Sequence, residues 1–367
     1  MNWQRWTFRA LDTCFFRNSS PFNSGEGGYT TTRTIFPPTM FTIQGAIRTS
    51  LALERGWLPG EERLWPKELG GPNDLGELKL RGPYLCFEDQ PYFSMPLLLL
   101  EKDGDFTRLL PGEQVECDLG YVSLPVPQRP IEGAKVPEGC YISRDGLAAV
   151  LEGGTPTKKD TKRSDELWVE ESRIGLERQD TTRTALEGHL YNCVHIRPRP
   201  KVKLVVFVLG IPGKWQVSNQ RILSLGGESR LAAVEVEAGE PAQLLPPPPH
   251  LTGGQDGKLR FTVTLITPGC YGELEDVERV ICEGPPGVPG RCISACIGKV
   301  QQIGGWDLLN RQPRSLISVV PPGSTWFYEG DPQYAEEITK LHGQCLSSRE
   351  AYGFGQIVIG KWEEEKK

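Results

Sequence analysis

The last third of the chain has the clearest periodic patterns of hydrophobic and polar residues, and these patterns predict strands and a helix. Residues 259–267 place Phe261, Val263 and Leu265 on one face, which is typical of a strand. Apolar extended segments follow at 292–303, 315–328 and 353–359, and a helix is expected after Asp331-Pro332, an N-cap followed by proline. Residues 268–291 show no period. The order strand, irregular segment, strand, strand, helix, strand indicates a ferredoxin-like fold whose first helix is degraded.

The first two thirds of the chain repeat this theme with longer insertions. Residues 3–9 alternate as a strand, and Pro37-Pro38-Thr39 introduces a helix to about Glu54. Asp103-Gly104 predicts a hairpin turn, Ser143 predicts the cap of a helix to Leu151, and strands are expected at 202–209 and 231–236. The Lys/Arg-rich segment 155–165 has no period, so we predict a mobile insertion there.

Four consecutive prolines mark the expected boundary between two domains. Pro246–Pro249 favour a stiff polyproline II spacer and cannot join a central strand. A chain of 367 residues also exceeds a typical single core. We therefore predict an α+β protein with two ferredoxin-like domains, carrying insertions and glycine-rich loops, over residues 1–245 and 250–367. Residues 246–249 are the linker.

Composition and charge narrow the class of protein. A hydrophobic content of 38% suits a globular protein, and apolar runs such as Leu97–Leu100 are too short to cross a bilayer. The first ten residues show no secretory signal pattern, so we expect a cytoplasmic protein with reduced cysteines. The net charge is −6, yet it is uneven: residues 58–154 carry 9 basic and 17 acidic side chains, whereas 1–57 and 155–203 are locally basic. A polyanion would therefore bind on a localised face.

Sequence motifs for nucleotide cofactors, metals and hydrolysis are missing. There is no G-x-x-x-x-G-K-[ST] and no G-x-G-x-x-G that opens a helix. The four cysteines between 270 and 296 contain no C-x-x-C pair, which favours buried thiols over zinc. His189 and His195 are the histidines to consider for acid/base cleavage of RNA, but each would require a close partner. We predict no cofactor, no metal and no enzymatic activity.

Glycine pairs beside arginines are the candidate anion-binding features. Glycines at element junctions let a ligand approach main-chain amides, and that ligand is often a phosphate, from either a nucleotide cofactor or RNA. Segment 173–191 has apolar ends and a polar tip, so it is either a solvated hairpin or an arm that sets guanidinium groups against phosphates while Tyr191 stacks on a base. Arg48 lies off the apolar stripe of its helix, so we expect it to face a ligand or solvent. On this chemistry we predict RNA contacts from Arg17, Gly25, Gly27, Gly28, Arg33, Arg48, Arg173, Arg178, Arg183 and Tyr191.

Several short sequences occur in an order that resembles a known family. Among them are Phe15-Phe16-Arg17, Gly25-Glu26-Gly27-Gly28, Gly45-Ala46-Ile47-Arg48-Thr49, Glu187-Gly188-His189-Leu190-Tyr191, Leu225-Gly226-Gly227-Glu228-Ser229-Arg230, Gly304-Gly305-Trp306-Asp307 and Tyr352-Gly353-Phe354-Gly355. In this order they are similar to the third subunit of the Cmr complex, a RAMP superfamily protein of type III-B CRISPR–Cas effectors. The resemblance spans nearly the whole chain, but no family sequence falls within 58–165.

The resemblance implies a non-catalytic subunit with two RAMP (RRM-like) domains that acts in antiviral defence. Such a subunit holds the 5′ tag of the guide RNA and contacts two partners, the large palm-domain subunit and the filament-forming RAMP backbone subunit. The resemblance places Gly226, Gly227 and Arg230 on an RNA-binding loop after the fourth core strand. It places Gly353, Phe354 and Gly355 on the C-terminal counterpart, for which we expect a role in closing the fold.

Two alternatives stay open at this point. One is a stand-alone endoribonuclease of the same superfamily, which would process guide RNA with His189 or His195. The other is the equivalent subunit of another type III subtype.

Overall fold

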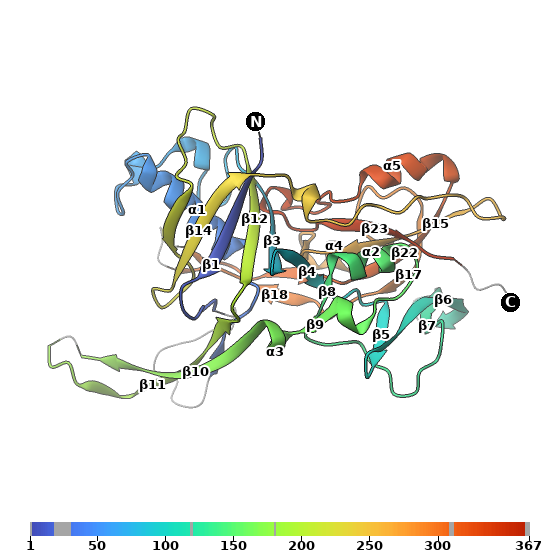
Figure 1. Cartoon of the computed structure of the whole chain (residues 1–367), viewed down its shortest axis with the longest axis horizontal. Helices are drawn as coiled ribbons and strands as arrows, with labels where there is room; N and C mark the ends of the chain where they lie inside the picture. Colours follow the sequence, from blue (N-terminus) through green and yellow to red (C-terminus); the bar gives the residue numbers. More distant parts are fainter. Residues whose placement is uncertain (1, 18–30, 118–119, 180, 308–311, 364–367) are drawn as a thin grey trace.

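The computed structural model describes residues 2–17, 31–117, 120–179, 181–307 and 312–363, and it shows a mixed α/β protein made mostly of antiparallel sheets with few helices (Figure 1). Within these ranges, no helix is long and apolar enough to cross a membrane.

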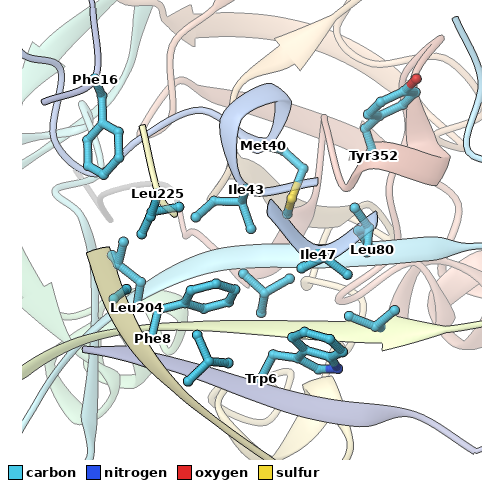
Figure 2. Packing of buried hydrophobic residues seen from close by; sticks show 14 of the residues in the cluster. Trp6, Phe8, Phe16, Met40, Ile43, Ile47, Leu80, Leu204, Leu225 and Tyr352 are labelled. Atoms are coloured by element: carbon cyan, nitrogen blue, oxygen red, sulfur yellow. The ribbon is translucent and has the colours of Figure 1, made fainter. Parts of the chain in front are cut away.

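An eight-stranded antiparallel sheet is the framework of the N-terminal part, in the spatial order β13 (Gln220–Ser224), β14 (Leu231–Ala238), β1 (Gln4–Ala10), β12 (Val202–Leu209), β3 (Lys79–Phe87), β4 (Gln90–Ser94), β8 (Cys140–Ser143) and β9 (Thr161–Arg163). Helix α1 (Met40–Glu54) covers one face, as predicted from the prolines before it. Figure 2 shows Ile43 and Ile47 of α1 packed toward Trp6 and Phe8 of β1, all of them buried. The alternation along β1 therefore selects the face that the helix covers.

A four-stranded antiparallel sheet carries the C-terminal part, in the spatial order β17 (Arg291–Cys296), β22 (Thr325–Gly330), β15 (Leu259–Leu265) and β23 (Ile357–Lys361). Asp331 caps the turn before helix α5 (Ala335–Lys340), accepting a hydrogen bond from the Gln333 amide at 2.9 Å. The prediction that 268–291 is irregular is wrong, because helix α4 (Leu274–Glu283) lies there and buries Val277 and Val280. Its apolar stripe spans too few turns for a period to stand out from the glycines and prolines around it.

Four smaller sheets attach to this framework. They are formed by β10 (Trp168–Arg178), β11 (Ala185–Pro198) and β2 (Thr31–Arg33); by β5 (Leu99–Lys102), β6 (Asp105–Cys117) and β7 (Gly120–Pro127); by β16 (Gly269–Cys270), β21 (Ile317–Val320) and β18 (Gln301–Ile303); and by β19 (Trp306–Asp307) and β20 (Gln312–Pro313). Strands β10 and β11 form the hairpin expected at 173–191, which projects from the body (Figure 1). The hairpin turn predicted at Asp103-Gly104 is confirmed between β5 and β6.

The prediction of a mobile insertion at 155–165 is wrong. Thr157 donates its amide to Asp160 Oδ2 at 2.8 Å in a short 3-10 turn, after which β9 pairs with β8 and helix α3 (Ser164–Leu167) leads into β10. Elements of three or four residues are too short to produce a readable period. The segment before them behaves as predicted: Ser143 Oγ accepts the Gly146 amide at 3.1 Å and caps helix α2 (Arg144–Leu151).

The N-terminal and C-terminal parts share buried contacts. Tyr84 of β3 donates its hydroxyl hydrogen to Gln356 Oε1 at 2.6 Å. Arg108 of β6 is almost fully buried, and its guanidinium donates to the carbonyl oxygens of Val150 (2.7 Å) and Lys361 (2.9 Å). Phe207 and Phe327 belong to one apolar cluster. The proline segment 246–249 is therefore not the only connection between the two parts.

Candidate nucleic-acid interface

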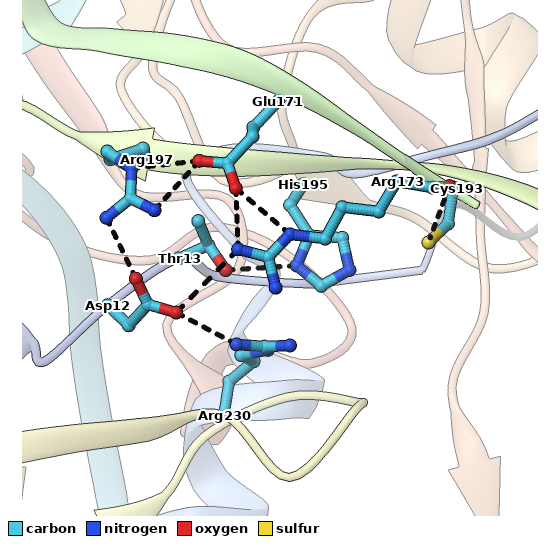
Figure 3. A network of polar contacts seen from close by, with 8 residues as sticks. All are labelled: Asp12, Thr13, Glu171, Arg173, Cys193, His195, Arg197 and Arg230. Carbon is cyan, nitrogen blue, oxygen red and sulfur yellow. Dashed lines mark hydrogen bonds and ion pairs between the residues drawn. The ribbon is translucent and has the colours of Figure 1, made fainter. Parts of the chain in front are cut away.

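The base of the β10–β11 hairpin gathers polar side chains from separate parts of the chain. We call this cluster the hairpin root, and it consists of Asp12, Thr13, Glu171, Arg173, Cys193, His195, Arg197 and Arg230 (Figure 3). In the antiparallel register Glu171 lies opposite His195 and Arg173 opposite Cys193, so their side chains share one face of the hairpin. Backbone hydrogen bonds between Cys14 and Ile196, at 2.7 and 3.0 Å, bring segment 12–17 against β11.

Two carboxylates hold three guanidinium groups in the hairpin root. Asp12 accepts hydrogen bonds from Arg197 at 2.8 Å and from Arg230 at 2.9 Å. Glu171 accepts from Arg173 at 2.6 Å and from Arg197 at 2.9 Å. The hydrogen bond from Arg197 holds the pKa of Asp12 below its usual range, and the bond from Arg173 does the same for Glu171. Because partly exposed ion pairs contribute little stability, the main effect of these carboxylates is to orient the three guanidinium groups.

His195 is buried beneath these ion pairs. Its Nδ1 lies 3.1 Å from Thr13 Oγ1, and its ring stacks on Phe15 with centroids 4.9 Å apart. Burial lowers the pKa of the imidazole, and the positive charges of Arg173 and Arg230 act in the same direction, while Glu228 opposes them. A neutral ring packed in this way supports the hairpin root from below.

The glycine loop predicted to bind RNA lies beside the hairpin root. It joins β13 to β14. Gly226 has φ +85°, and a Cβ there would lie 2.4 Å from the Phe15 carbonyl oxygen. Gly227 donates its amide to that same oxygen at 2.8 Å. The loop is therefore docked on segment 12–17, and it positions Arg230 beside Asp12.

Other residues predicted to bind RNA lie around the hairpin root or along the hairpin. Arg17 is exposed and forms a backbone bridge with Thr34, and Arg33 lies in β2, which pairs with β11. Arg178 and Tyr191 belong to β10 and β11, and Arg183 is exposed at the hairpin tip. The predicted residues Gly25, Gly27 and Gly28 lie outside the described ranges.

Arg48 is buried, so the expectation that it faces a ligand or solvent is wrong. Its guanidinium donates to the carbonyl oxygens of Gly70 (2.9 Å) and Gly71 (2.6 Å) and to Gln44 Oε1 (2.9 Å), and it lies 5.5 Å from the Trp65 ring. Burial lowers the pKa of this guanidinium. The loop after the 3-10 turn Lys67–Leu69 covers α1 at this point, and the periodicity of α1 alone contains no sign of that cover.

The C-terminal glycine turn is enclosed by protein. Thr267 donates its hydroxyl hydrogen to the Gly353 carbonyl at 2.7 Å, and Phe354 is buried with its ring 5.2 Å from that of Phe41 on α1. Gly353 has φ +80°, and a Cβ there would lie 2.9 Å from the Leu80 carbonyl oxygen. The turn thus joins the C-terminal part to α1 and β3.

The hairpin root contains residues that the sequence prediction missed. Asp12, Thr13 and Arg197 were not identified, and Glu171 had no assigned role. The one available signal was the pairing of alternating polar residues, Glu171 with Arg173 and His195 with Arg197, on the two arms of one hairpin.

The cysteines between 270 and 296 do not gather into one site. Cys270 and Cys296 are buried, whereas Cys282 is exposed. In the part of the chain that the structure describes, no group of three or more His, Cys, Asp or Glu residues is placed to hold a metal ion.

Comparison with known proteins identifies the class. Residues 6–362 match the family described as CRISPR-associated protein (Cas_Cmr3). Because the match covers nearly the whole chain, the protein belongs to this family, and the resemblance read from the sequence is confirmed. No curated protein matches the chain.

Two solved structures share the fold of this chain. A chain in the cryo-EM structure of the type III-B Cmr-beta bound to cognate target RNA and AMPPnP, state 1, has a TM-score of 0.51 and 15% identity, and the match covers 92% of this chain and 88% of that chain. A chain in the structure of the type III-B Cmr-beta bound to cognate target RNA has a TM-score of 0.51 and 16% identity, with 97% and 99% covered. At these identities the likeness shows a shared fold.

Proposed function

We propose that the chain is a non-catalytic subunit of a type III-B Cmr effector and that its hairpin root binds the 5′ tag of the guide RNA. Membership of the Cas_Cmr3 family, and a fold shared with chains of Cmr-beta complexes bound to target RNA, support the assembly. The observation that carries the RNA-binding step is the hairpin root itself. There Arg173, Arg197 and Arg230 converge at the base of a projecting hairpin.

The chemistry of the hairpin root suits selective contacts with an RNA strand. Guanidinium groups form paired hydrogen bonds with phosphates and with base edges, and Asp12 and Glu171 hold them in fixed directions. Glu228 lies close enough to act on His195 and Cys193, so the hairpin root is nearly balanced in charge. A balanced site adds little nonspecific attraction for RNA. We therefore expect the hairpin root to contribute recognition of the RNA, with the exposed hairpin tip extending along the RNA strand.

The same proposal includes the architecture of the RAMP domains. In the C-terminal part, the chain order β15–α4–β17–β22–α5–β23 combined with the sheet order β17-β22-β15-β23 supports a ferredoxin-like unit. In the N-terminal part, β1, β3, β12 and β14 lie in the corresponding order, with α1 after β1 and the β13 segment in place of a second helix. Residues 1–245 and 250–367 are the proposed domains.

The proposed partners are the guide RNA, the large palm-domain subunit and the filament-forming RAMP backbone subunit, in the cytoplasm. Photo-crosslinking in the assembled complex tests the RNA contact, with 4-thiouridine placed in the 5′ tag. We expect adducts in peptides covering 168–198 or 225–230, and far fewer when the label lies at the distal end of the guide. Tag-labelled RNA that crosslinks to other subunits but to neither segment would overturn the proposal.

The endoribonuclease alternative has a separate test. Purified protein is incubated with repeat-containing RNA and EDTA, and we expect no cleavage. Metal-independent cleavage that His189→Ala abolishes would replace the binding role with a catalytic one.

A further inference from the structure

A second group of arginines, where α1 meets the C-terminal part, contacts neutral atoms. We call it the junction patch, and it consists of Phe41, Arg48, Trp306, Arg314, Arg349 and Tyr352. The Arg349 guanidinium lies 5.7 Å from the Phe41 ring and 6.0 Å from the Tyr352 ring. Arg314 donates to the side-chain oxygen of Asn73 at 3.2 Å. Arg48 donates to carbonyl and amide oxygens, as described above.

The positive charges of the junction patch act on Tyr352, and Arg349 lies nearest to its ring. Burial raises the pKa of this phenol, and the charges of Arg48, Arg349 and Arg314 each act against that increase. Figure 2 shows Tyr352 at the edge of the core cluster, with its hydroxyl directed away from Met40 and Leu80.

The carboxylates near the junction patch do not neutralise it. Asp74 acts on Arg48 and Tyr352, but its oxygens accept the backbone amides of Gly71 (3.1 Å) and Gly76 (2.8 Å). Glu350, next to Arg349 in the chain, is exposed and forms no ion pair with it. Across the described residues, none of Arg48, Arg314 and Arg349 forms a salt bridge with a carboxylate.

Arg349 lies against the Phe41 ring, and Arg314 lies near the same Phe41 side chain at Gly305. Like charges in this position repel one another, and an anion bound between them would relieve the repulsion. Arg314 and Arg349 are only partly buried, so an anion can reach them from solvent. Two parallel N–H bonds from a guanidinium match the oxygens of a phosphate.

Aromatic rings beside these cations indicate which anion fits. Trp306 is 51% exposed on β19, next to Gly305, whose carbonyl oxygen accepts the Arg314 amide at 2.9 Å. Phe41 also lies near Gly305, since a Cβ on Gly305 would be 3.8 Å from Phe41 and 3.4 Å from Arg314. Bases of single-stranded RNA stack on such rings while arginines hold the backbone. An acidic peptide would bind the arginines and leave the indole exposed.

We propose that the junction patch binds a phosphate of single-stranded RNA, with Arg314 and Arg349 as donors and Trp306 as the surface on which the adjacent base stacks. The patch is distinct from the hairpin root, because its residues come from α1, the β19–β20 hairpin and the 3-10 turn Glu350–Tyr352. It rests on the proposed function only in taking RNA as the ligand, and it requires no tag sequence.

Salt-dependent binding of the full chain tests this proposal. The dissociation constants of two fluorescent RNAs, one with the tag and one without, are measured between low and moderate salt. We expect Arg314→Gln/Arg349→Gln to weaken the binding of both RNAs equally and to reduce the slope of log K against log salt by about 0.7, the effect of losing one phosphate contact. The matched control is Arg279→Gln/Arg291→Gln, which removes two exposed arginines beside α4.

A second variant distinguishes a loss of RNA contacts from a loss of folding. Trp306→Ala removes an exposed side chain. We expect it to raise the dissociation constants of both RNAs about tenfold, the order of one lost base–aromatic stack, without changing the salt slope. Unchanged affinity and slope in both folded variants would overturn the proposal. Equal effects in the control pair would do so as well.

The outcome is separable from that of the proposed function. If the wild-type chain shows no preference for tagged RNA but the junction variants still weaken binding, the hairpin-root proposal fails and the junction-patch proposal stands. If tag preference is present and the junction variants bind like the wild type, only the junction-patch proposal fails.

Discussion

The hairpin root and the junction patch hold three arginines each, but they stabilise them in opposite ways. In the hairpin root, Asp12 and Glu171 pair with every guanidinium. In the junction patch, carbonyl oxygens, amide oxygens and aromatic rings surround the guanidinium groups. The carboxylates of the hairpin root fix the direction of each donor and cancel its charge. The neutral partners in the junction patch leave the positive charge available to an anion.

This difference suggests a division of labour in RNA binding. A charge-balanced set of oriented donors discriminates between ligands but adds little attraction at a distance. An uncompensated set attracts phosphates of any sequence and is sensitive to salt. The hairpin root would then supply selectivity for the tag, and the junction patch would supply affinity. Changes to either region can break or sharpen this comparison.

The largest effect is expected where the glycine loop meets segment 12–17. Gly226→Ala places a Cβ 2.4 Å from the Phe15 carbonyl oxygen at φ +85°, so we expect the free energy of unfolding to fall by about 2–4 kcal/mol. Denaturant unfolding measures the change. Gly213→Ala is the control, because nothing lies within 4 Å of its added Cβ. Equal stability of the two variants would show that the loop is not docked as described.

A slightly smaller effect is expected at the buried arginine of the junction patch. Arg48→Ala leaves the carbonyl oxygens of Gly70 and Gly71 without their donor, and we expect a loss of about 2–3 kcal/mol in unfolding free energy. Thermal and denaturant unfolding measure it. Arg279→Ala, at an exposed site on α4, is the control and should change stability by less than about 0.5 kcal/mol. A loss no larger than that of the control would mean that Arg48 is not enclosed.

The buried histidine of the hairpin root predicts a pH dependence. Because burial lowers the folded-state pKa of His195 from 6.5, the unfolded chain takes up a proton first as the pH falls. The stability is therefore fully present above about pH 6.5 and declines below it. His342 is half-buried, and burial lowers its pKa too, so it acts in the same direction.

The comparison between wild type and His195→Gln isolates the contribution of the hairpin root. We expect the wild type to lose more stability than the variant between pH 7 and pH 5, measured by urea unfolding at each pH. Parallel pH profiles would contradict a buried, neutral His195.

The smallest effect separates the two regions by their response to salt. A double-mutant cycle on Arg173 and Glu171 should give a coupling energy of about 0.3–1 kcal/mol that decreases as salt is added. A cycle on Arg349 and Phe41 should give about 0.5–1 kcal/mol, with little dependence on salt because the ring carries no net charge. The same salt response in both cycles would remove the distinction between the regions.

The sequence predicted elements whose pattern is long or begins with a distinct cap. Strand β12, helix α1 after its prolines, helix α2 after Ser143, and the β10–β11 hairpin are confirmed. Helix α4 and segment 155–165 were misread because their elements are too short to show a period. The local sequence pattern therefore predicts an element only where the pattern repeats over several residues or a distinct cap marks its start.

The candidate site was predictable in part, and for a physical reason. Segments rich in arginine and glycine were visible along the chain, and the fold brings Arg17, Arg173 and Arg230 toward the hairpin root. The carboxylate that links them, Asp12, lies more than 150 positions from its partners, so only the pairing of distant strands reveals it. Arg48 was misplaced because the loop that covers it is a tertiary feature.

Tag preference in the full chain tests the central claim most directly. The quantity is the ratio of dissociation constants for RNA without and with the tag, compared among wild type, Arg173→Gln/Arg197→Gln and Arg314→Gln/Arg349→Gln. We expect the ratio to fall toward one in the hairpin-root variant, and to remain at the wild-type value in the junction variant even though both RNAs bind more weakly. A folded hairpin-root variant that keeps the wild-type ratio would contradict recognition of the tag at the hairpin root.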